Sequence, residues 1–215
     1  MYELYTYFRS SAAYRVRIAL NLKGLACEYH PIHLLREGGE QKSADYRRLN
    51  PQGLVPTLVD DGEPFTQSLA ILEYLEETHP EPTLLPSDAE GCARVRALAL
   101  AIACDIHPLN NLRVLAYLRD NLGIDEPART RWYRHWIAEG FEAFEALLTG
   151  SPAIGRFCHG DRPTLADICL VPQVFNARRF DMDLGGFPTI RRIDAACLEI
   201  AAFRDAAPSV QPDAE

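Results

Sequence analysis

Residues 7–20 read Tyr-Phe-Arg-Ser-Ser-Ala-Ala-Tyr-Arg-Val-Arg-Ile-Ala-Leu, and this stretch decides the fold. Ser10 and Ser11 stand where a helical pattern begins, and Ser is a favoured N-cap because its oxygen accepts a bond from an unpaired amide. A helix N-terminus carries partial positive charge, so it suits a phosphate, a carboxylate or a thiolate. The stretch lacks the glycines of a phosphate-binding loop, which disfavours phosphate. Helix capping alone is the other interpretation of the two serines.

The amino-acid composition limits the classes of protein to which this chain can belong. The chain has 215 residues, 47% hydrophobic and 24% charged, as expected for a globular protein of one or two domains. The net charge of −8 and the lack of any Lys or Arg run disfavour a nucleic-acid partner. No apolar stretch approaches the roughly 20 residues that span a membrane, and residues 1–5 do not resemble a signal peptide. We therefore expect no membrane partner.

The six cysteines suggest neither a disulfide framework nor a metal site. None forms a C-x-x-C pair or a Cys/His group with zinc-ligand spacing. Several lie in apolar helical patterns, where free Cys behaves as a small buried hydrophobe. With no signal peptide, this composition predicts a reducing cytoplasm.

The first 80 or so residues alternate between strand and helix patterns. Proline in the second strand places that strand at a sheet edge, and Pro56 requires a strand start, an edge or a special turn. The order β-α-β-α-β-β-α predicts a small α/β domain with a mixed sheet. The expected strands are 2–7, 27–34, 54–60 and 64–66, and the expected helices are 11–23, 43–49 and 67–78, with Gly24 as the first C-cap.

Beyond residue 88 the pattern is helical only. Prolines 80, 82 and 86 punctuate a linker, so we expect one domain over 1–82 and an all-helical domain over 88–215. Pro108 predicts a break in the long stretch 89–121. The other expected helices are 126–149, 165–179 and 188–203, and the polar tail 208–215 is expected to be loose.

Some features of the helical part are expected to be structural. Thr164 and Asp167 fit a capping box before an apolar run, so Asp167 is a fold determinant rather than a catalytic acid. The helix 126–149 offers five large side chains as core: Trp132, Trp136, Phe141, Phe144 and Leu147.

Several segments, in order, resemble one family. Ser10-Ser11 before Tyr14–Leu20 resembles the Ser-Ser-Cys-x-x-Arg-Val-Arg-Ile-Ala-Leu signature of zeta-class glutathione transferases. Asn50-Pro51 with Val55-Pro56-Thr57-Leu58 is similar to the cis-proline segment of the thioredoxin-like domain, and 67–71 to the segment that holds γ-glutamyl. Residues 105–111, 170–174 and 177–180 resemble the helical domain of bacterial maleylacetoacetate and maleylpyruvate isomerases.

The resemblance implies the glutathione transferase fold: a thioredoxin-like α/β domain followed by an all-α domain, in a homodimer. It implies glutathione as cofactor, whose thiolate adds reversibly to a double bond. Ser10 with the helix N-terminus would hold the thiolate, while Ser11 orients, caps or replaces it. Val55 would pair its main chain with glutathione, Pro56 would be cis, and Gln67 with Ser68 would hold the γ-glutamyl carboxylate.

The resemblance also implies a small dicarboxylate-like acid as substrate, so cations are expected beside the thiol. Arg9 adjoins Ser10 and is assigned to catalysis and to the substrate; Arg113 and, more weakly, Arg179 are assigned to the substrate. His107 and Asn111, expected as an i, i+4 pair on one helix, are assigned to glutathione. His107 is assigned to the substrate as well, its alternative being a bond to a carbonyl at the kink. Arg15 and Arg17 are expected in salt bridges or at an interface.

Four functions compete. The leading hypothesis is a glutathione-dependent maleylacetoacetate isomerase of aromatic amino-acid breakdown, and the nearest alternative is a maleylpyruvate isomerase. Ala12 stands where the zeta signature commonly has Cys, and this difference strengthens the hypothesis that maleylpyruvate is the substrate. A third hypothesis is a transferase that acts on α-haloacids or other small electrophiles. The fourth is a non-catalytic interaction scaffold, which the intact thiol-site motifs disfavour.

Overall fold

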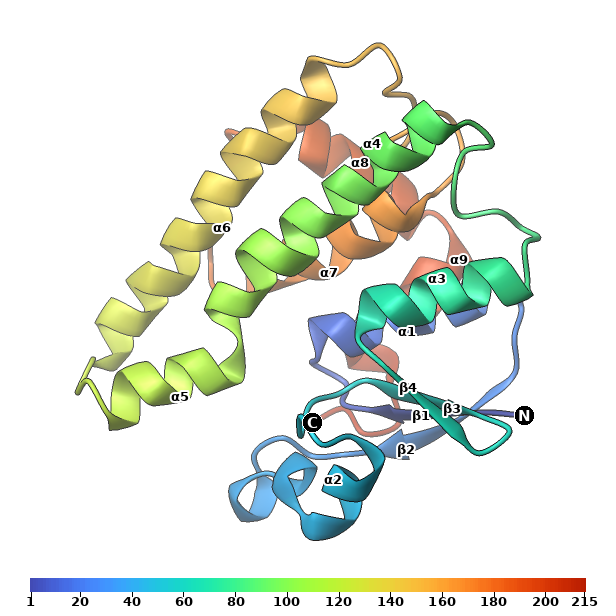
Figure 1. Cartoon of the computed structure of the whole chain (residues 1–215). Helices are drawn as coiled ribbons and strands as arrows, with labels where there is room; N and C mark the ends of the chain where they lie inside the picture. The colour runs from blue at the N-terminus through green and yellow to red at the C-terminus, as the bar shows by residue number, and fades with distance from the viewer. The chain divides into compact units, whose positions relative to one another are not determined.

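The computed structural model describes residues 1–215, which divide into two compact units (Figure 1). Unit 1 comprises Met1–Leu84 together with Leu198–Glu215, and unit 2 comprises Leu85–Cys197. The expected division at residues 82–88 lies beside the first boundary. The last residues of the chain, expected in the helical domain, instead belong with unit 1.

Unit 1 is built on a mixed four-stranded sheet. Its strands β1 (Tyr2–Thr6), β2 (Cys27–Pro31), β3 (Thr57–Asp60) and β4 (Glu63–Thr66) lie in the order β2-β1-β3-β4. β1 is parallel to β2 and antiparallel to β3. The predicted mixed sheet is confirmed, as is the edge position of the strand that contains Pro31. β3 starts later than predicted, at Thr57, because Pro56 has no amide to donate.

The helices of unit 1 are α1 (Ser11–Leu22), α2 (Ala44–Leu49), α3 (Ser68–Thr78) and α9 (Ala201–Asp205). α1 packs against α3 and α9, and Figure 1 shows α1 and α3 on one side of the sheet with α2 on the other. Gly24, at φ 65°, follows the C-cap of α1, as expected for a left-handed residue that ends a helix. Short 3-10 turns span Arg36–Gly38, Glu40–Lys42 and Pro208–Val210.

Two expectations for the C-terminal part are wrong. The predicted helix over 188–203 is two helices, α8 (Pro188–Leu198) and α9, because Ile200 takes an extended conformation as the N-cap of α9. The tail is not loose: Gln211 is buried, and its Nε2 donates to the carbonyls of Asp205 and Ala207. The polar residues of the tail form hydrogen bonds with other parts of unit 1. The composition of the tail could not predict these contacts.

Unit 2 consists of helices, as predicted. They are α4 (Ala89–Leu100), a π-helical turn (Ala101–Ile106), a 3-10 turn (His107–Asn110), α5 (Leu112–Asp120), α6 (Glu126–Thr149), α7 (Leu165–Arg179) and α8. The predicted break before Pro108 is confirmed. A Cβ on Gly140 would lie 2.2 Å from Ile106 Cδ1, so this glycine lets the π-helical turn approach α6. No helix is both long and apolar enough to cross a membrane.

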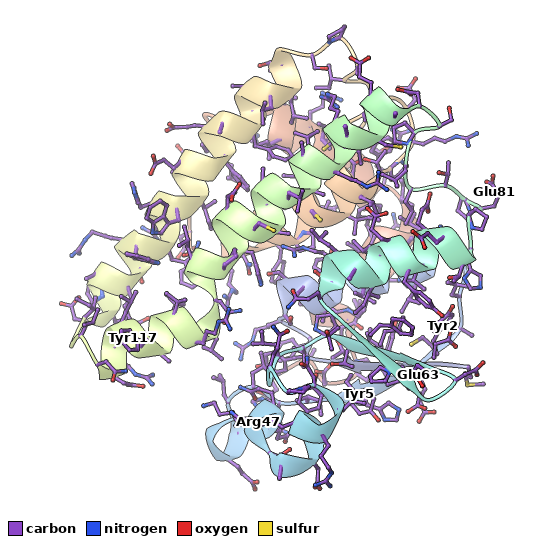
Figure 2. The ribbon with its side chains drawn as sticks, in the orientation of Figure 1. Tyr2, Tyr5, Arg47, Glu63, Glu81 and Tyr117 are labelled. Atoms are coloured by element: carbon purple, nitrogen blue, oxygen red, sulfur yellow. The ribbon has the colours of Figure 1, made fainter.

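The expected core of α6 is confirmed at Phe141 and Phe144 but is wrong at Trp132, Trp136 and Leu147. Its core residues are Tyr133, Ile137, Phe141, Phe144 and Leu148, at intervals of three and four. Trp132 and Trp136 are only half-buried, and Leu147 is 52% exposed. Trp132 donates its Nε1 proton to the carbonyl of Leu109, a polar requirement that keeps the indole at the margin of the core. On α5, which has no buried residue, Tyr117 is exposed (Figure 2).

The predicted capping box at the start of α7 is confirmed. One carboxylate oxygen of Asp167 accepts from the amide of Thr164 at 2.8 Å and its hydroxyl at 2.9 Å, and the other accepts from the amide of Cys158 at 2.8 Å. Burial raises the pKa of Asp167, whereas these bonds act in the opposite direction. Asp167 therefore joins the loop 152–163 to the most buried helix of unit 2.

We expect Asp167→Ala to lower the free energy of unfolding by about 3 kcal/mol, because it removes a cap and leaves buried N–H groups unpaired. Urea denaturation of the full chain measures this. Glu142→Ala, on the exposed face of α6, is the matched control and is expected to change stability by less than about 0.5 kcal/mol. Equal stability of the two variants would contradict the structural role of Asp167.

Candidate active site

The first element of the candidate site is the N-terminus of α1. Ser10 is the N-cap, with φ −70° and ψ 117°, and its Oγ accepts from the amide of Ala13 at 3.2 Å. Because Oγ is the acceptor in this bond, the cap does not use the hydroxyl proton, and the side chain is half-buried. Ser11 is the first helical residue and is 6% exposed. Ser10 is therefore the more accessible hydroxyl at this positive helix end.

Arg9 precedes the cap and is fixed by aromatic side chains. Its Nη2 donates to the hydroxyl of Tyr7 at 2.8 Å, and its guanidinium lies 4.9 Å from the centre of the Phe8 ring. The side chain is half-buried, and its contacts in unit 1 are with these rings rather than with a carboxylate. Arg9 thus brings positive charge next to Ser10 without a negative partner from the chain.

The second element is the segment before β3. The Val55–Pro56 peptide bond is cis, as the resemblance implied. The β3–β4 ladder ends at Thr57↔Thr66, so the main chain of half-buried Val55 lies beyond the last paired residue. A peptide-like ligand could extend the sheet at this point.

Asn50 and Tyr46 support this segment from behind. The side-chain amide of Asn50 and the hydroxyl of Tyr46 both donate to the carbonyl of Leu54, at 2.8 and 2.7 Å. The same two groups contact the hydroxyl of Thr57, at 3.3 and 3.0 Å. The resemblance places Asn50 in the cis-proline segment, but the role of Tyr46 is not evident from the sequence, because nothing in its surroundings distinguishes it from a core tyrosine.

The third element is the N-terminus of α3. Gln67 is exposed and has φ 67°, a left-handed conformation that costs a non-glycine residue about 1–3 kcal/mol and is concentrated at functional sites. No side chain caps this helix end. Gln67 donates to the side-chain oxygen of Gln52 at 2.7 Å, a partner that we did not predict. The buried Ser68 accepts from Arg15 Nη1 at 3.2 Å, which links α3 to α1.

The expectation of a salt bridge needs correction for Arg17, whose hydrogen-bond partners are neutral oxygens rather than a carboxylate. The side chains of Arg15 and Arg17 are both buried, 1% and 0% exposed. Arg17 donates to the hydroxyl of Thr6 and to the carbonyls of Tyr7, Phe8 and Ala206. Burial lowers its pKa to about 10, so it keeps its charge at neutral pH. The bonds to neutral oxygens were not predictable, because spacing alone cannot distinguish a carbonyl partner from a carboxylate.

The remaining predicted site residues belong to unit 2. His107 opens a 3-10 turn, and Asn111 is the extended N-cap of α5, whose side chain accepts from the amide of Arg113 at 3.1 Å. His107 and Asn111 are therefore not an i, i+4 pair on one helix, because the turn around Pro108 separates them. Arg113 is exposed on α5. Arg179 is exposed at the end of α7, where its guanidinium lies 4.8 Å from the centre of the Phe180 ring.

Arg178 has a different role from its neighbour. Its Nη2 donates to a carboxylate oxygen of the buried Asp194 at 2.6 Å, which joins α7 to α8. Of the two adjacent arginines, Arg179 is therefore the one without a carboxylate partner in unit 2.

The cysteines agree with the expectation of small buried hydrophobes in three cases. Cys158, Cys169 and Cys197 are buried, and all six cysteines are free thiols. Burial raises the pKa of Cys158 and Cys197, and it raises the pKa of Cys27 to about 12. These three thiols are poor sources of thiolate at neutral pH.

Comparison with known proteins places these elements in a family. Residues 4–83 match the glutathione S-transferase N-terminal domain, and residues 126–211 match the C-terminal domain. A probable maleylacetoacetate isomerase of Vibrio cholerae serotype O1 is 53% identical over 98% of this chain and 97% of its own length. The family models thus cover most of both units.

Two solved structures are also similar. The holo structure of a maleylpyruvate isomerase, described as a bacterial zeta-class glutathione S-transferase, has a TM-score of 0.96 and 53% identity, with 99% of this chain and 100% of that chain covered. A maleylacetoacetate isomerase of Methylobacterium extorquens AM1, solved with bound malonate and glutathione, has a TM-score of 0.95 and 42% identity, with 99% of each chain covered. The chain belongs to the zeta-class glutathione S-transferase family, together with the maleylacetoacetate and maleylpyruvate isomerases.

Proposed function

We propose that the protein is a glutathione-dependent cis–trans isomerase of a maleyl acid, with maleylacetoacetate as the first candidate substrate and maleylpyruvate as the second. The observation that carries the proposal is Ser10, which caps α1 and keeps its hydroxyl proton free beside the unpartnered charge of Arg9. One group can hold a thiolate and the other a carboxylate. The names and bound ligands of the similar proteins support the same substrate class.

The residues of unit 1 fit glutathione. When bound, glutathione supplies a thiolate that adds to the substrate's double bond and is expelled after rotation, so that it is regenerated. The main chain of Val55, beyond the end of the β3–β4 ladder, would pair with its cysteinyl residue. Gln67 and Ser68, at the uncapped N-terminus of α3, would hold its γ-glutamyl carboxylate.

Ser10 is proposed to stabilise the thiolate by donating its hydroxyl proton to the sulfur. The positive end of α1 favours the same charged form. Ala12 excludes a protein thiol at its position, and the raised pKa values of Cys27, Cys158 and Cys197 make these residues unsuitable substitutes. The proposal therefore takes the nucleophile from the cofactor.

Arg9 is proposed to hold a carboxylate of the substrate and to offset the negative charge that develops on its oxygen after addition. Arg113, Arg179 and His107 are proposed as further substrate contacts, and Asn111 and His107 as glutathione contacts. These assignments rest on the resemblance and on the exposure of both arginines in unit 2. The homodimer and the cytoplasmic setting belong to the same proposal.

The function is tested with purified full-length protein by following the absorbance of maleylacetoacetate and of maleylpyruvate, each with and without glutathione. We expect glutathione-dependent isomerisation of at least one acid. S-methylglutathione, which lacks the thiol, is the control and should support no turnover. Binding of glutathione without turnover of either acid would contradict the isomerase and favour a transferase for another electrophile.

Ser10→Ala is expected to lower kcat/KM about a hundredfold, because a hydrogen bond to a charged group contributes about 1.5–3 kcal/mol. Steady-state kinetics measure this, and Ser209→Ala, at an exposed serine in the turn Pro208–Val210, controls for substitution itself. A larger loss in Ser11→Ala than in Ser10→Ala would transfer the thiolate contact to Ser11.

Arg9→Met is expected to raise the KM of the maleyl acid at least about tenfold, because a bidentate charge-assisted contact is lost. Glutathione affinity, measured by calorimetry, should change much less. Arg131→Met, at an exposed position of α6, is the matched control. An unaltered KM would remove Arg9 from the substrate site.

A further inference from the structure

The main chain of Phe8, the residue before Arg9, is held from both sides by charged groups. Its amide donates to Asp213 Oδ2 at 2.9 Å, and its carbonyl accepts from Arg17 Nη2 at 3.0 Å. The bond from Arg17 is buried, whereas the bond to Asp213 is part-buried. Charge-assisted bonds of this kind are roughly twice as strong as neutral ones. They fix both peptide planes that flank Phe8.

Asp213 is itself held in place, because the segment that carries it is anchored on either side. Upstream, Tyr14 donates to the carbonyl of Phe203 at 3.1 Å, and Arg17 Nε donates to that of Ala206 at 3.0 Å. Nearer to it, the buried Gln211 donates to the carbonyls of Asp205 and Ala207, and downstream Glu215 pairs with Arg36 at the surface. In Figure 1 the C-terminal end lies beside the sheet of unit 1. Asp213 is therefore a fixed acceptor rather than part of a mobile tail.

The position of Phe8 is transmitted to the two proposed site residues through short bonds. The amide of Ser10 donates to the carbonyl of Tyr7 at 2.9 Å, and Arg17 Nη1 contacts the same oxygen at 3.4 Å. Arg9 lies over the ring of Phe8 and donates to the hydroxyl of Tyr7. A shift of the Phe8 peptide would therefore move both the hydroxyl at the cap and the guanidinium.

We propose that Asp213 is a positioning residue of the active site. Its hydrogen bond to the amide of Phe8 holds the Arg9 guanidinium and the Ser10 hydroxyl in their positions. The proposal rests on the proposed function for the roles of Arg9 and Ser10. It does not depend on the carboxylate touching substrate or glutathione. Misplacement of reacting groups by about 1 Å can cost a hundredfold in rate, so a distant support of this kind has a measurable effect.

The test compares three variants of the full chain. Asp213→Ala removes the acceptor, whereas Asp213→Asn removes the charge but keeps an oxygen that can accept from Phe8. Asp205→Ala is the matched control, because its exposed side chain lies in the same C-terminal segment and does not contact residues 7–10. The readouts are thermal unfolding, glutathione affinity, the pH profile of kcat/KM, and hydrogen exchange at the amide of Phe8.

We expect Asp213→Ala to lower kcat/KM about tenfold, to move the thiol limb of the pH profile upward, and to accelerate exchange at Phe8, in a protein that still unfolds cooperatively. Asp213→Asn should recover to within about threefold of the parent protein. Asp205→Ala should match the parent. Activity of Asp213→Ala within twofold of the parent, or an Asp213→Asn variant as impaired as the alanine variant, would overturn the proposal.

Failure of the two proposals can be distinguished. If the parent protein isomerises neither acid, the proposed function fails, and the positioning proposal is then decided by exchange at Phe8 and by the ultraviolet absorbance of the bound thiolate. Unchanged exchange and absorbance in Asp213→Ala would overturn it even then. If the parent is active and only the variants disagree with expectation, the positioning proposal fails alone.

Discussion

The buried guanidinium of Arg17 is the interaction on which unit 1 most depends. One planar group donates to oxygens on β1, on the loop that follows it and on the segment before Pro208. An isolated buried charge is expensive, so removing its acceptors or replacing it with a shorter cation would leave polar atoms unpaired inside the unit. Arg17 thereby links residues 6–8, near the start of the chain, to Ala206, near its end.

The candidate site follows from that arrangement, because it consists of polar groups that regular structure leaves unused. The N-terminal ends of α1 and α3 have amides without intrahelical partners, and the main chain of Val55 lies beyond the end of a ladder. Buried side chains such as Arg15, Tyr46 and Asn50 hold these groups from behind. The buried hydrogen bonds therefore hold in place main-chain polar groups that have no partner within a helix or a strand ladder. A peptide-like thiol can form hydrogen bonds with these groups.

Much of this was predictable from local sequence. The Ser10 cap, the Gly24 stop, the break before Pro108 and the Thr164–Asp167 box each depend on residues within one or two turns of each other. The errors have a different origin. The buried face of α6 depends on neighbours distant in sequence, so Trp132 and Leu147 were misassigned. Similarly, His107 and Asn111 were placed on one helix because periodicity cannot show where a 3-10 turn replaces an α-helical one.

The sequence by itself determined the order of strands and helices over residues 1–82, the family, and the residue types that suit a thiolate and a carboxylate, because these depend on short-range chemistry and on motifs. Only the tertiary structure decided what Arg17 and Asp213 do. Apart from the Thr6 hydroxyl, their partners are main-chain groups, which every residue possesses, so no pattern of side chains identifies them. Asp213 meets the amide of Phe8 only after the C-terminal segment has packed beside α1, and that packing is a property of the folded chain.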